Sequence, residues 1–262
     1  MADALDGFEK TSYTALGATR SIYRMGSGPA VIVIAEMPGI TPDVAGFGRK
    51  VADRGLTTVM PHLFGDDGRP VSAGYTASSL ARACIAKEFT VMARKKTSPV
   101  TAWLRALAAD EHARCGGPGV GAVGMCFTGG FALAMMVDDR MVAPVLSQPS
   151  LPFPTSRANR RDLGISDDDL AAVKARAAEG TCVLGLRFTG DRLSPPERFA
   201  HLREELGDAF ISVELDSSTG NPHGHKRAAH SVLTGDLDDR EGTPTRRAVD
   251  QVLDFLSDRL LG

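Results

Sequence analysis

The 262-residue sequence lacks the features that mark membrane, secreted or nucleic-acid-binding proteins. No apolar run approaches the roughly 20 residues that span a bilayer, so no membrane partner is expected. The formal net charge is −2, and this near-neutral balance gives no basic surface for nucleic acid. The opening residues, Met1 to Lys10, are acidic and polar, without the basic and apolar regions of a secretory signal, which predicts a cytoplasmic location.

Cysteine is also scarce, and no two cysteines have the spacing of a zinc or redox pair. The four positions are Cys84, Cys115, Cys126 and Cys182. We expect free thiols and no bound metal. With 43% apolar and 24% charged residues, the composition is that of a globular protein. A chain of this length needs no disulfides to fold, and we expect one domain over residues 1–262.

Short apolar runs alternate with longer amphipathic segments. The runs predict buried strands at Val31–Ala35, Leu56–Met60, Val120–Gly124, Val142–Ser147, Cys182–Phe188 and Phe210–Leu215. The amphipathic segments predict helices at Pro42–Arg54, Ser78–Lys95, Pro99–Ala109, Asp167–Ala178, Pro195–Leu206 and Thr245–Leu260. This alternation predicts an α/β fold with a mostly parallel sheet covered on both faces. Gly17 lies between two alternating runs and predicts an antiparallel N-terminal hairpin. Two long loops, Pro61–Thr76 and Asp216–Arg227, are expected to border a site.

The segment Gly121–Gly130 (GAVGMCFTGG) follows a predicted buried strand and precedes a helical pattern at Phe131–Val137. A strand that turns abruptly into a helix needs small residues because the backbones approach closely. This pattern is typical of the nucleophile elbow, with Cys126 at the apex and Thr128 in place of the second glycine. The helix N-terminus would stabilise a thiolate, although a small buried cysteine in a tight turn fits the same pattern.

A thiol nucleophile needs a base, and the base needs an orienting acid. Asp191 follows the predicted strand Cys182–Phe188, where this fold would deliver the acid, although it could also cap the next helix. Three histidines beyond the last predicted strand are candidates for the base: His223, His225 and His230. The order nucleophile, acid, histidine is that of α/β-hydrolases, so the joint pattern predicts a catalytic triad.

Acyl transfer also needs donors for the developing oxyanion. In such a fold these are the backbone N–H of the residue after the nucleophile, Phe127, and one after an earlier strand, for which Met37 is the natural choice. Glu36 is a carboxylate at the end of the apolar strand Val31–Ala35. It is either a loop charge facing water or a partner that controls protonation of the thiol.

The chain resembles the dienelactone hydrolase family of α/β-hydrolases. The segments that carry the resemblance are Val31–Gly39 (VIVIAEMPG), Gly124–Gly130 (GMCFTGG), Phe188–Asp191 (FTGD) and Ala229–Ser231 (AHS). The resemblance implies Cys126 as nucleophile, Asp191 as acid and Glu36 as the resting partner of the thiol. The family histidine lies in a Gly/Ala-His-Ser context before an apolar helical segment, here Leu253–Leu256, which favours His230 over the other two.

Two departures from the family pattern concern the substrate and the elbow. Members specific for dienelactone are expected to hold the substrate carboxylate with one arginine before the elbow and another soon after the histidine. The second position falls on Thr234, which cannot make a bidentate charge contact. Arg82 and Lys87 are candidates for the first, although either could be a solvated helix charge. Thr128 should alter the first turn after the elbow.

The resemblance implies hydrolysis of a lactone or small ester through a thioester, with no metal or organic cofactor, and the sequence does not indicate an oligomeric state. Two alternatives stay open. Glutamine amidotransferases also place cysteine in such an elbow, but usually carry their acid two residues after the histidine, where this chain has Val232. A catalytically silent hydrolase scaffold could instead bind a ligand.

Overall fold

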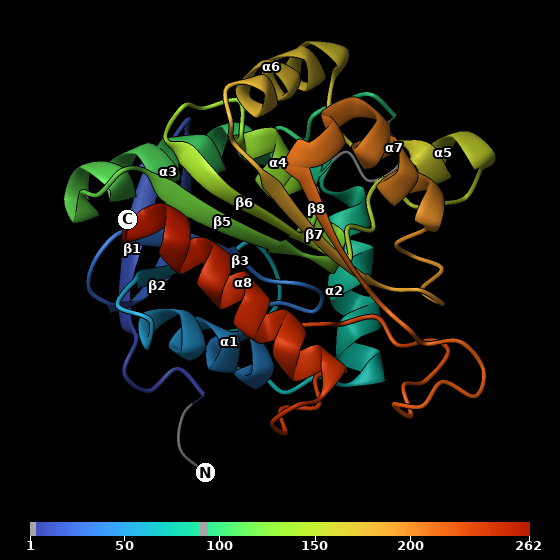
Figure 1. Ribbon diagram of the computed structural model, residues 1–262. Helices are drawn as coiled ribbons and strands as arrows, with labels where there is room; N and C mark the ends of the chain where they lie inside the picture. The colour runs from blue at the N-terminus through green and yellow to red at the C-terminus, as the bar shows by residue number, and fades with distance from the viewer. Residues whose placement is uncertain (1–3, 90–93) are drawn as a thin grey trace.

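A computed structural model describes residues 4–89 and 94–262 and contains one eight-stranded sheet (Figure 1). The strands are β1 (Glu9–Ala15), β2 (Ala18–Gly26), β3 (Ala30–Ile34), β4 (Thr57–Pro61), β5 (Val120–Met125), β6 (Met141–Ser147), β7 (Val183–Phe188) and β8 (Phe210–Leu215). Their order across the sheet is β1-β2-β4-β3-β5-β6-β7-β8. The pairs β1–β2 and β2–β4 are antiparallel, and every other neighbouring pair is parallel.

The helices lie between the strands in sequence, as the alternating pattern predicts. They are α1 (Pro42–Ala52), α2 (Ala73–Ile85), α3 (Val100–Cys115), α4 (Phe131–Met135), α5 (Arg157–Arg161), α6 (Asp167–Ala178), α7 (Pro196–Leu206) and α8 (Pro244–Leu260). In the described residues, no helix combines the length and apolar character of a membrane span.

Helices cover both faces of the sheet, and each face has its own apolar core. On one face, α1 and α8 pack through Val44, Phe47 and Val252, and Figure 1 shows these two helices side by side there. On the other face, α3 and α4 contribute Leu104 and Leu133 to the second core. Because β3, β4, β5 and β7 are buried along their whole length, their sequences are almost continuously apolar instead of alternating.

The α/β-hydrolase fold class predicted from the sequence is confirmed, including the N-terminal hairpin. Leu16 and Gly17 form its two-residue turn with φ values of 50° and 77°, both in the left-handed region that such turns require. The predicted strands agree with the observed ones to within one residue at each end. The antiparallel pairing of β1 with β2 extends the parallel part of the sheet at one edge.

The prediction of a helix at Ser78–Lys95 is wrong in its bounds. The helix α2 begins at Ala73 because the Ser72 side chain accepts a hydrogen bond from the backbone N–H of Tyr75 at 3.3 Å, and it ends at Ile85. A short 3₁₀ helix, Lys87–Phe89, follows, and part of the predicted range lies outside the described residues. The predicted loop therefore ends at Ser72. The short helix α5 is missing from the sequence prediction.

The parallel strands carry the site because their carboxyl ends meet at one edge of the sheet. Cys126 follows β5, Glu36 lies two residues beyond β3, and Asp191 lies three residues beyond β7. The turn after β5 is packed against the segment after β6, since a Cβ atom at Gly129 would lie 2.5 Å from the Pro149 Cα. This edge is therefore tightly packed where the candidate residues gather.

We predict that Gly129→Ala lowers the free energy of unfolding by about 1–3 kcal/mol, because the added methyl group overpacks against the Pro149 backbone. Urea denaturation measures the change. Gly46→Ala is the matched control: its Cβ would meet nothing within 4 Å inside α1. That variant should gain about 0.5–1 kcal/mol from helix propensity. Equal stability of the Gly129→Ala variant and the wild type would contradict the packing argument.

Candidate active site

Cys126 occupies a sharp turn between strand and helix. It follows β5 directly and has φ of +53°, in the left-handed region that non-glycine residues rarely adopt. The backbone around it is crowded, because a Cβ at Gly124 would clash with the Thr128 carbonyl oxygen. The thiol is partly exposed, although the residues on both sides are buried. The geometry is that of a nucleophile elbow.

Thr128, the departure from the usual elbow pattern, ties this turn to the neighbouring strand. Its buried hydroxyl lies 2.9 Å from the Ile34 carbonyl oxygen, and it accepts a hydrogen bond from the Met125 N–H at 3.0 Å. A glycine there could make neither contact. Thr128 begins no regular α-helix: the turn Cys126–Thr128 is a 3₁₀ helix, and α4 is only five residues long.

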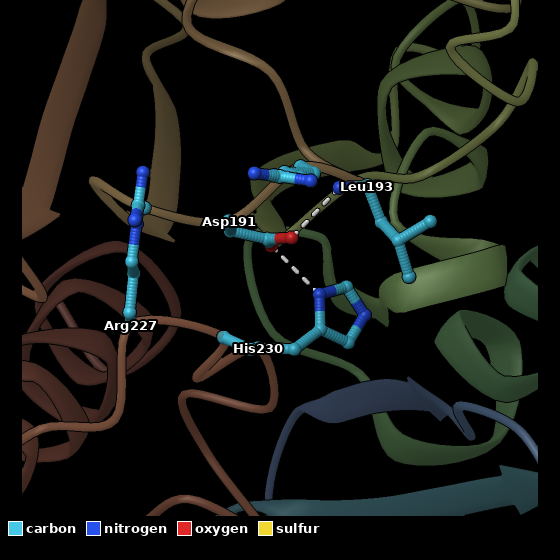
Figure 2. A pocket seen from close by; sticks show the side chains of 7 residues that line it. Asp191, Leu193, Arg227 and His230 are labelled. Carbon is cyan, nitrogen blue, oxygen red and sulfur yellow. Dashed lines mark hydrogen bonds and ion pairs between the residues drawn. The ribbon is translucent and has the colours of Figure 1, made fainter.

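The structure brings Asp191 and His230 into direct contact. The Nδ1 atom of His230 lies 2.7 Å from Oδ2 of Asp191, as Figure 2 shows. The other carboxylate oxygen of Asp191 accepts a hydrogen bond from the Leu193 N–H at 2.8 Å. Asp191 is buried, so these two bonds fix its orientation. A carboxylate on Nδ1 leaves Nε2 as the nitrogen that can exchange a proton.

Asp236, which the sequence analysis missed, holds the loop that carries His230. One of its carboxylate oxygens accepts hydrogen bonds from the backbone N–H groups of His230 and Ser231, at 2.7 and 3.1 Å. Its position five residues after an Ala-His-Ser segment is no recognisable signal. His225, one of the alternative bases, instead has its Nδ1 atom 2.7 Å from the Asp216 carbonyl oxygen. His223 packs against that ring, with 5.6 Å between centroids.

The thiol and the imidazole interact electrostatically. Burial lowers the pKa of His230, but the negative charge of a Cys126 thiolate and the hydrogen bond to Asp191 outweigh it, and the pKa lies well above 6.5. Within the described residues, Nε2 of His230 is buried and has no hydrogen-bond partner of ordinary geometry. The Cys126 sulfur is therefore close enough to His230 to raise the pKa of the imidazole.

Glu36 is buried in a network of hydroxyl and amide groups. Its carboxylate accepts hydrogen bonds from Ser231 at 2.8 Å, from the Gln148 amide at 3.2 Å, and from Thr234. Burial raises its pKa, while these hydrogen bonds and the charge of His230 lower it in part. Thr234, which stands where the family pattern expects an arginine, thus donates a hydrogen bond to Glu36. Neither Gln148 nor Ser231 was expected in this role.

The backbone donors expected for an oxyanion lie at the same edge of the sheet. Phe127 follows Cys126 directly, and Met37 lies three residues past β3, which pairs with β5. Among the described residues, nothing accepts a hydrogen bond from the Met37 N–H. Their role as oxyanion donors stays a prediction.

A cavity of about 330 Å³ lies beside the Asp191–His230 pair. Figure 2 shows side chains that line it, and the full set is Gly190, Asp191, Arg192, Leu193, Arg227, Ala228 and His230. Arg82 does not line this cavity and is exposed on α2, while the side chain of Lys87 lies outside the described residues. Carboxylate binding by these two cations stays a prediction.

We predict that the His230 imidazole stays protonated through neutral pH and loses its proton only well above pH 6.5, because the thiolate charge and Asp191 favour the imidazolium. Replacing Cys126 by alanine removes the thiolate charge, so the titration of His230 should then move to lower pH. NMR of the imidazole Cε1–H group across pH 5–10 measures both. An unchanged titration in the Cys126→Ala variant would show that the two groups do not interact.

We compared the chain with models of protein families, with curated proteins and with solved structures. The model of the dienelactone hydrolase family matches residues 20–259 of the chain. No curated protein matches the chain. A solved structure of a dienelactone hydrolase-like promiscuous phosphotriesterase from metagenomic libraries aligns with a TM-score of 0.64 and 16% identity, covering 97% of this chain and 98% of that one.

Two further solved structures have the same fold at low identity. A cold-adapted esterase from an Arctic intertidal metagenomic library aligns with a TM-score of 0.60 and 15% identity, covering 97% of this chain and 94% of that one. The thioesterase domain from the curacin biosynthetic pathway gives 0.59 and 11%, covering 95% and 100%. Since the family model covers nearly the whole sequence and the sheet has the same architecture, the chain belongs to the dienelactone hydrolase family.

Proposed function

We propose that this protein hydrolyses a lactone or small ester, with Cys126 as the nucleophile and a thioester as the intermediate. The observation that carries the proposal is the meeting of three side chains from separate segments. Cys126 stands at a strained elbow, and the His230–Asp191 hydrogen bond of 2.7 Å leaves one imidazole nitrogen free beside it. Family membership supports hydrolysis as the reaction class.

The resting nucleophile in this proposal is a thiolate paired with an imidazolium. The raised pKa of His230 favours the state in which the proton has passed from sulfur to Nε2. Asp191 holds the ring in the orientation that presents Nε2, and its charge stabilises the imidazolium. An ionised Glu36 would add to that stabilisation, because its interaction with His230 is reciprocal, while burial raises the Glu36 pKa and opposes this charge.

Acylation begins when the sulfur attacks the substrate carbonyl carbon and forms a C–S bond. The carbonyl oxygen gains negative charge and accepts hydrogen bonds from the N–H groups of Met37 and Phe127. Collapse of this intermediate breaks the bond between carbon and the ring or alcohol oxygen. The leaving oxygen takes the proton from His230, so a neutral alcohol departs and a thioester remains on Cys126.

Deacylation runs through the same groups in reverse. His230, now neutral, takes a proton from a water molecule as that water attacks the thioester carbonyl. The same two N–H groups stabilise the second oxyanion, and the C–S bond then breaks. The products are a carboxylic acid and the thiolate, which is again paired with the imidazolium. No step requires a metal ion or an organic cofactor.

The family resemblance implies that Glu36 pairs directly with the resting thiol, but the contacts of its carboxylate favour an indirect role. Its carboxylate accepts hydrogen bonds from Ser231 and Gln148, and it would have to leave them in order to protonate the sulfur. Thr234 adds a further hydrogen bond to the same carboxylate. We therefore propose that Glu36 acts on the thiol mainly through His230. Thr234 offers no cation to a substrate, which favours uncharged lactones over carboxylated ones.

We also propose that the protein acts in the cytoplasm, where its four free cysteines would stay reduced.

We predict that Cys126→Ala loses at least about 10³-fold in kcat/KM on every lactone or ester that the wild type hydrolyses, because the nucleophile is absent. The variant should unfold at the same urea concentration as the wild type. Cys182→Ala is the matched control, since Cys182 precedes β7 and lies outside the site. Mass spectrometry of an acid-quenched reaction should also find the acyl group on Cys126.

The same experiments separate the alternatives. A Cys126→Ala variant with normal turnover would falsify the nucleophile assignment. Release of ammonia from glutamine, with no activity on esters, would favour the amidotransferase class instead. Limiting iodoacetamide should label Cys126 before the other three cysteines in an active enzyme. Equal labelling of all four would favour a ligand-binding scaffold.

A further inference from the structure

Ser150 contacts the candidate nucleophile through both its backbone and its side chain. It lies in the segment after β6, three residues beyond Ser147. Its N–H donates to the Cys126 carbonyl oxygen at 2.9 Å, and its hydroxyl oxygen lies 3.8 Å from the Cys126 sulfur. Ser150 is completely buried, so water does not compete for this hydroxyl. It is thus a buried hydrogen-bond donor next to the reacting atom.

The hydroxyl of Ser150 has two acceptors for its single proton. Besides the sulfur, it lies 3.0 Å from the Gln148 carbonyl oxygen. A neutral thiol is a weak acceptor, so the proton is expected to favour the carbonyl oxygen while sulfur is protonated. A thiolate is a charged acceptor and forms a stronger hydrogen bond. Rotation of one O–H bond therefore lets Ser150 respond to the charge on sulfur.

The need for such a donor follows from the helix after the elbow. A long helix would stabilise the thiolate with its N-terminal dipole. Here a 3₁₀ turn at Cys126–Thr128 comes first, and α4 contains only five residues, Phe131–Met135. Neighbouring groups are therefore further candidates for stabilising the charge on sulfur. His230 is one of them, and Ser150, whose hydroxyl oxygen lies 3.8 Å from the sulfur, is a second.

Arg198 fixes the segment that carries Ser150. Its guanidinium is buried on α7 and donates to the carbonyl oxygens of Pro149 and Pro152, both at 2.7 Å. Two more carbonyl oxygens, of Asp162 and Asn159, accept at 2.7 and 2.9 Å. Among the described residues, no carboxylate forms an ion pair with Arg198, and burial lowers its pKa to about 10. The buried guanidinium donates its hydrogen bonds to main-chain carbonyl oxygens and so fixes the segment 149–162. We call this arrangement the Arg198 clamp.

The elbow and Arg198 both contact Pro149. Gly129 approaches Pro149 so closely that a Cβ there would lie 2.5 Å from its Cα, and Arg198 binds the Pro149 carbonyl oxygen. Ser150, the next residue, has little freedom to move relative to the sulfur. The position of its hydroxyl is thus set by contacts on both sides of the chain.

We propose that Ser150 is a further catalytic residue that stabilises the Cys126 thiolate by donating its hydroxyl hydrogen bond to sulfur, and that Arg198 is the positioning residue that holds it there. This inference rests on the proposed nucleophilic role of Cys126. It assigns to one hydroxyl and one remote guanidinium a role in the reactivity of the thiol. The bonds made and broken in acylation and deacylation are the same with or without this hydrogen bond.

The test is the rate of Cys126 alkylation by iodoacetamide as a function of pH, followed by mass spectrometry with Cys182 as an internal reference. Ser150→Ala removes the hydroxyl but keeps the backbone N–H that donates to Cys126. We expect the pH of half-maximal alkylation to rise by about one unit and the rate at pH 6 to fall about tenfold. Ser150→Thr keeps a hydroxyl and should lie closer to the wild type. A Ser150→Ala profile that coincides with the wild-type profile would overturn the proposal.

The role of Arg198 is tested by a double-mutant cycle. Arg198→Met should move the alkylation profile in the same direction as Ser150→Ala, and the double variant should move it no further, because Arg198 acts through Ser150. Additive shifts would refute positioning through Ser150. If Arg198→Met does not fold, Arg198→Lys keeps a cation for the same carbonyls and should give a smaller shift. Arg203→Met, at the exposed end of α7, is the control and should change nothing.

Failure of this inference is distinct from failure of the proposed function. If Cys126 is not alkylated ahead of Cys182 in the wild type, or Cys126→Ala still hydrolyses esters, the nucleophile assignment fails and the inference fails with it. If the wild type passes both checks and only the Ser150→Ala profile is unchanged, the hydrolase proposal stands and the role of Ser150 is refuted. Thermal unfolding of each variant shows whether a change in rate reflects a change in fold.

Discussion

The site depends on one backbone constraint, the left-handed conformation of Cys126 at the end of β5. A φ of +53° costs a non-glycine residue free energy, of order 1 kcal/mol or more, which the surrounding packing must offset. Thr128 anchors the turn to the Ile34 carbonyl, and the missing side chain at Gly129 lets the turn lie against Pro149. The turn in this way brings the sulfur to the carboxyl edge of the sheet, where the loops after β3, β6 and β7 converge.

Buried charge is the second organising feature of this edge. Asp191 and Glu36 are both buried carboxylates, and His230 is the titratable base that interacts with each. Asp191 makes a direct hydrogen bond to the imidazole, while Glu36 is held by hydroxyl and amide donors and acts at longer range. In the proposed mechanism, a proton that moves from sulfur to His230 is stabilised by the hydrogen bond to Asp191, which favours the ion pair that nucleophilic attack requires.

Sequence reasoning could propose the parts of the candidate site that have local patterns. The sequence indicates the elbow because close backbone approach demands glycines at fixed spacing. It indicates Asp191 because this residue follows a buried apolar strand. The choice of His230 needed the family pattern, since three histidines fit the chain order equally well. The helix α2 was misplaced because Ser72, a capping residue, lies inside a segment that resembles a loop.

Ser150, Asp236 and Arg198 have no comparable signal. Each acts through hydrogen bonds to main-chain groups, such as the carbonyl oxygens held by Arg198 and the N–H groups held by Asp236. Main-chain groups are the same at every position, so no residue pattern records which one is bound. Serine is common in loops, and an arginine in an amphipathic helix normally faces solvent. Only the fold shows that Arg198 points inward.

The proposed sulfur nucleophile raises the question of which groups stabilise its negative charge. The sequence predicts that a helix N-terminus stabilises the thiolate, and the helical segment after Cys126 consists of a 3₁₀ turn followed by the five-residue α4. In our proposal the surrounding segments add two discrete donors: an imidazolium held by Asp191 and the Ser150 hydroxyl, whose segment Arg198 holds. Such donors act over one hydrogen bond, so they demand positions exact to a fraction of an ångström. The dense main-chain hydrogen bonding of residues 149–162 meets that demand, since it couples the nucleophile to a helix, α7, that lies outside the elbow itself.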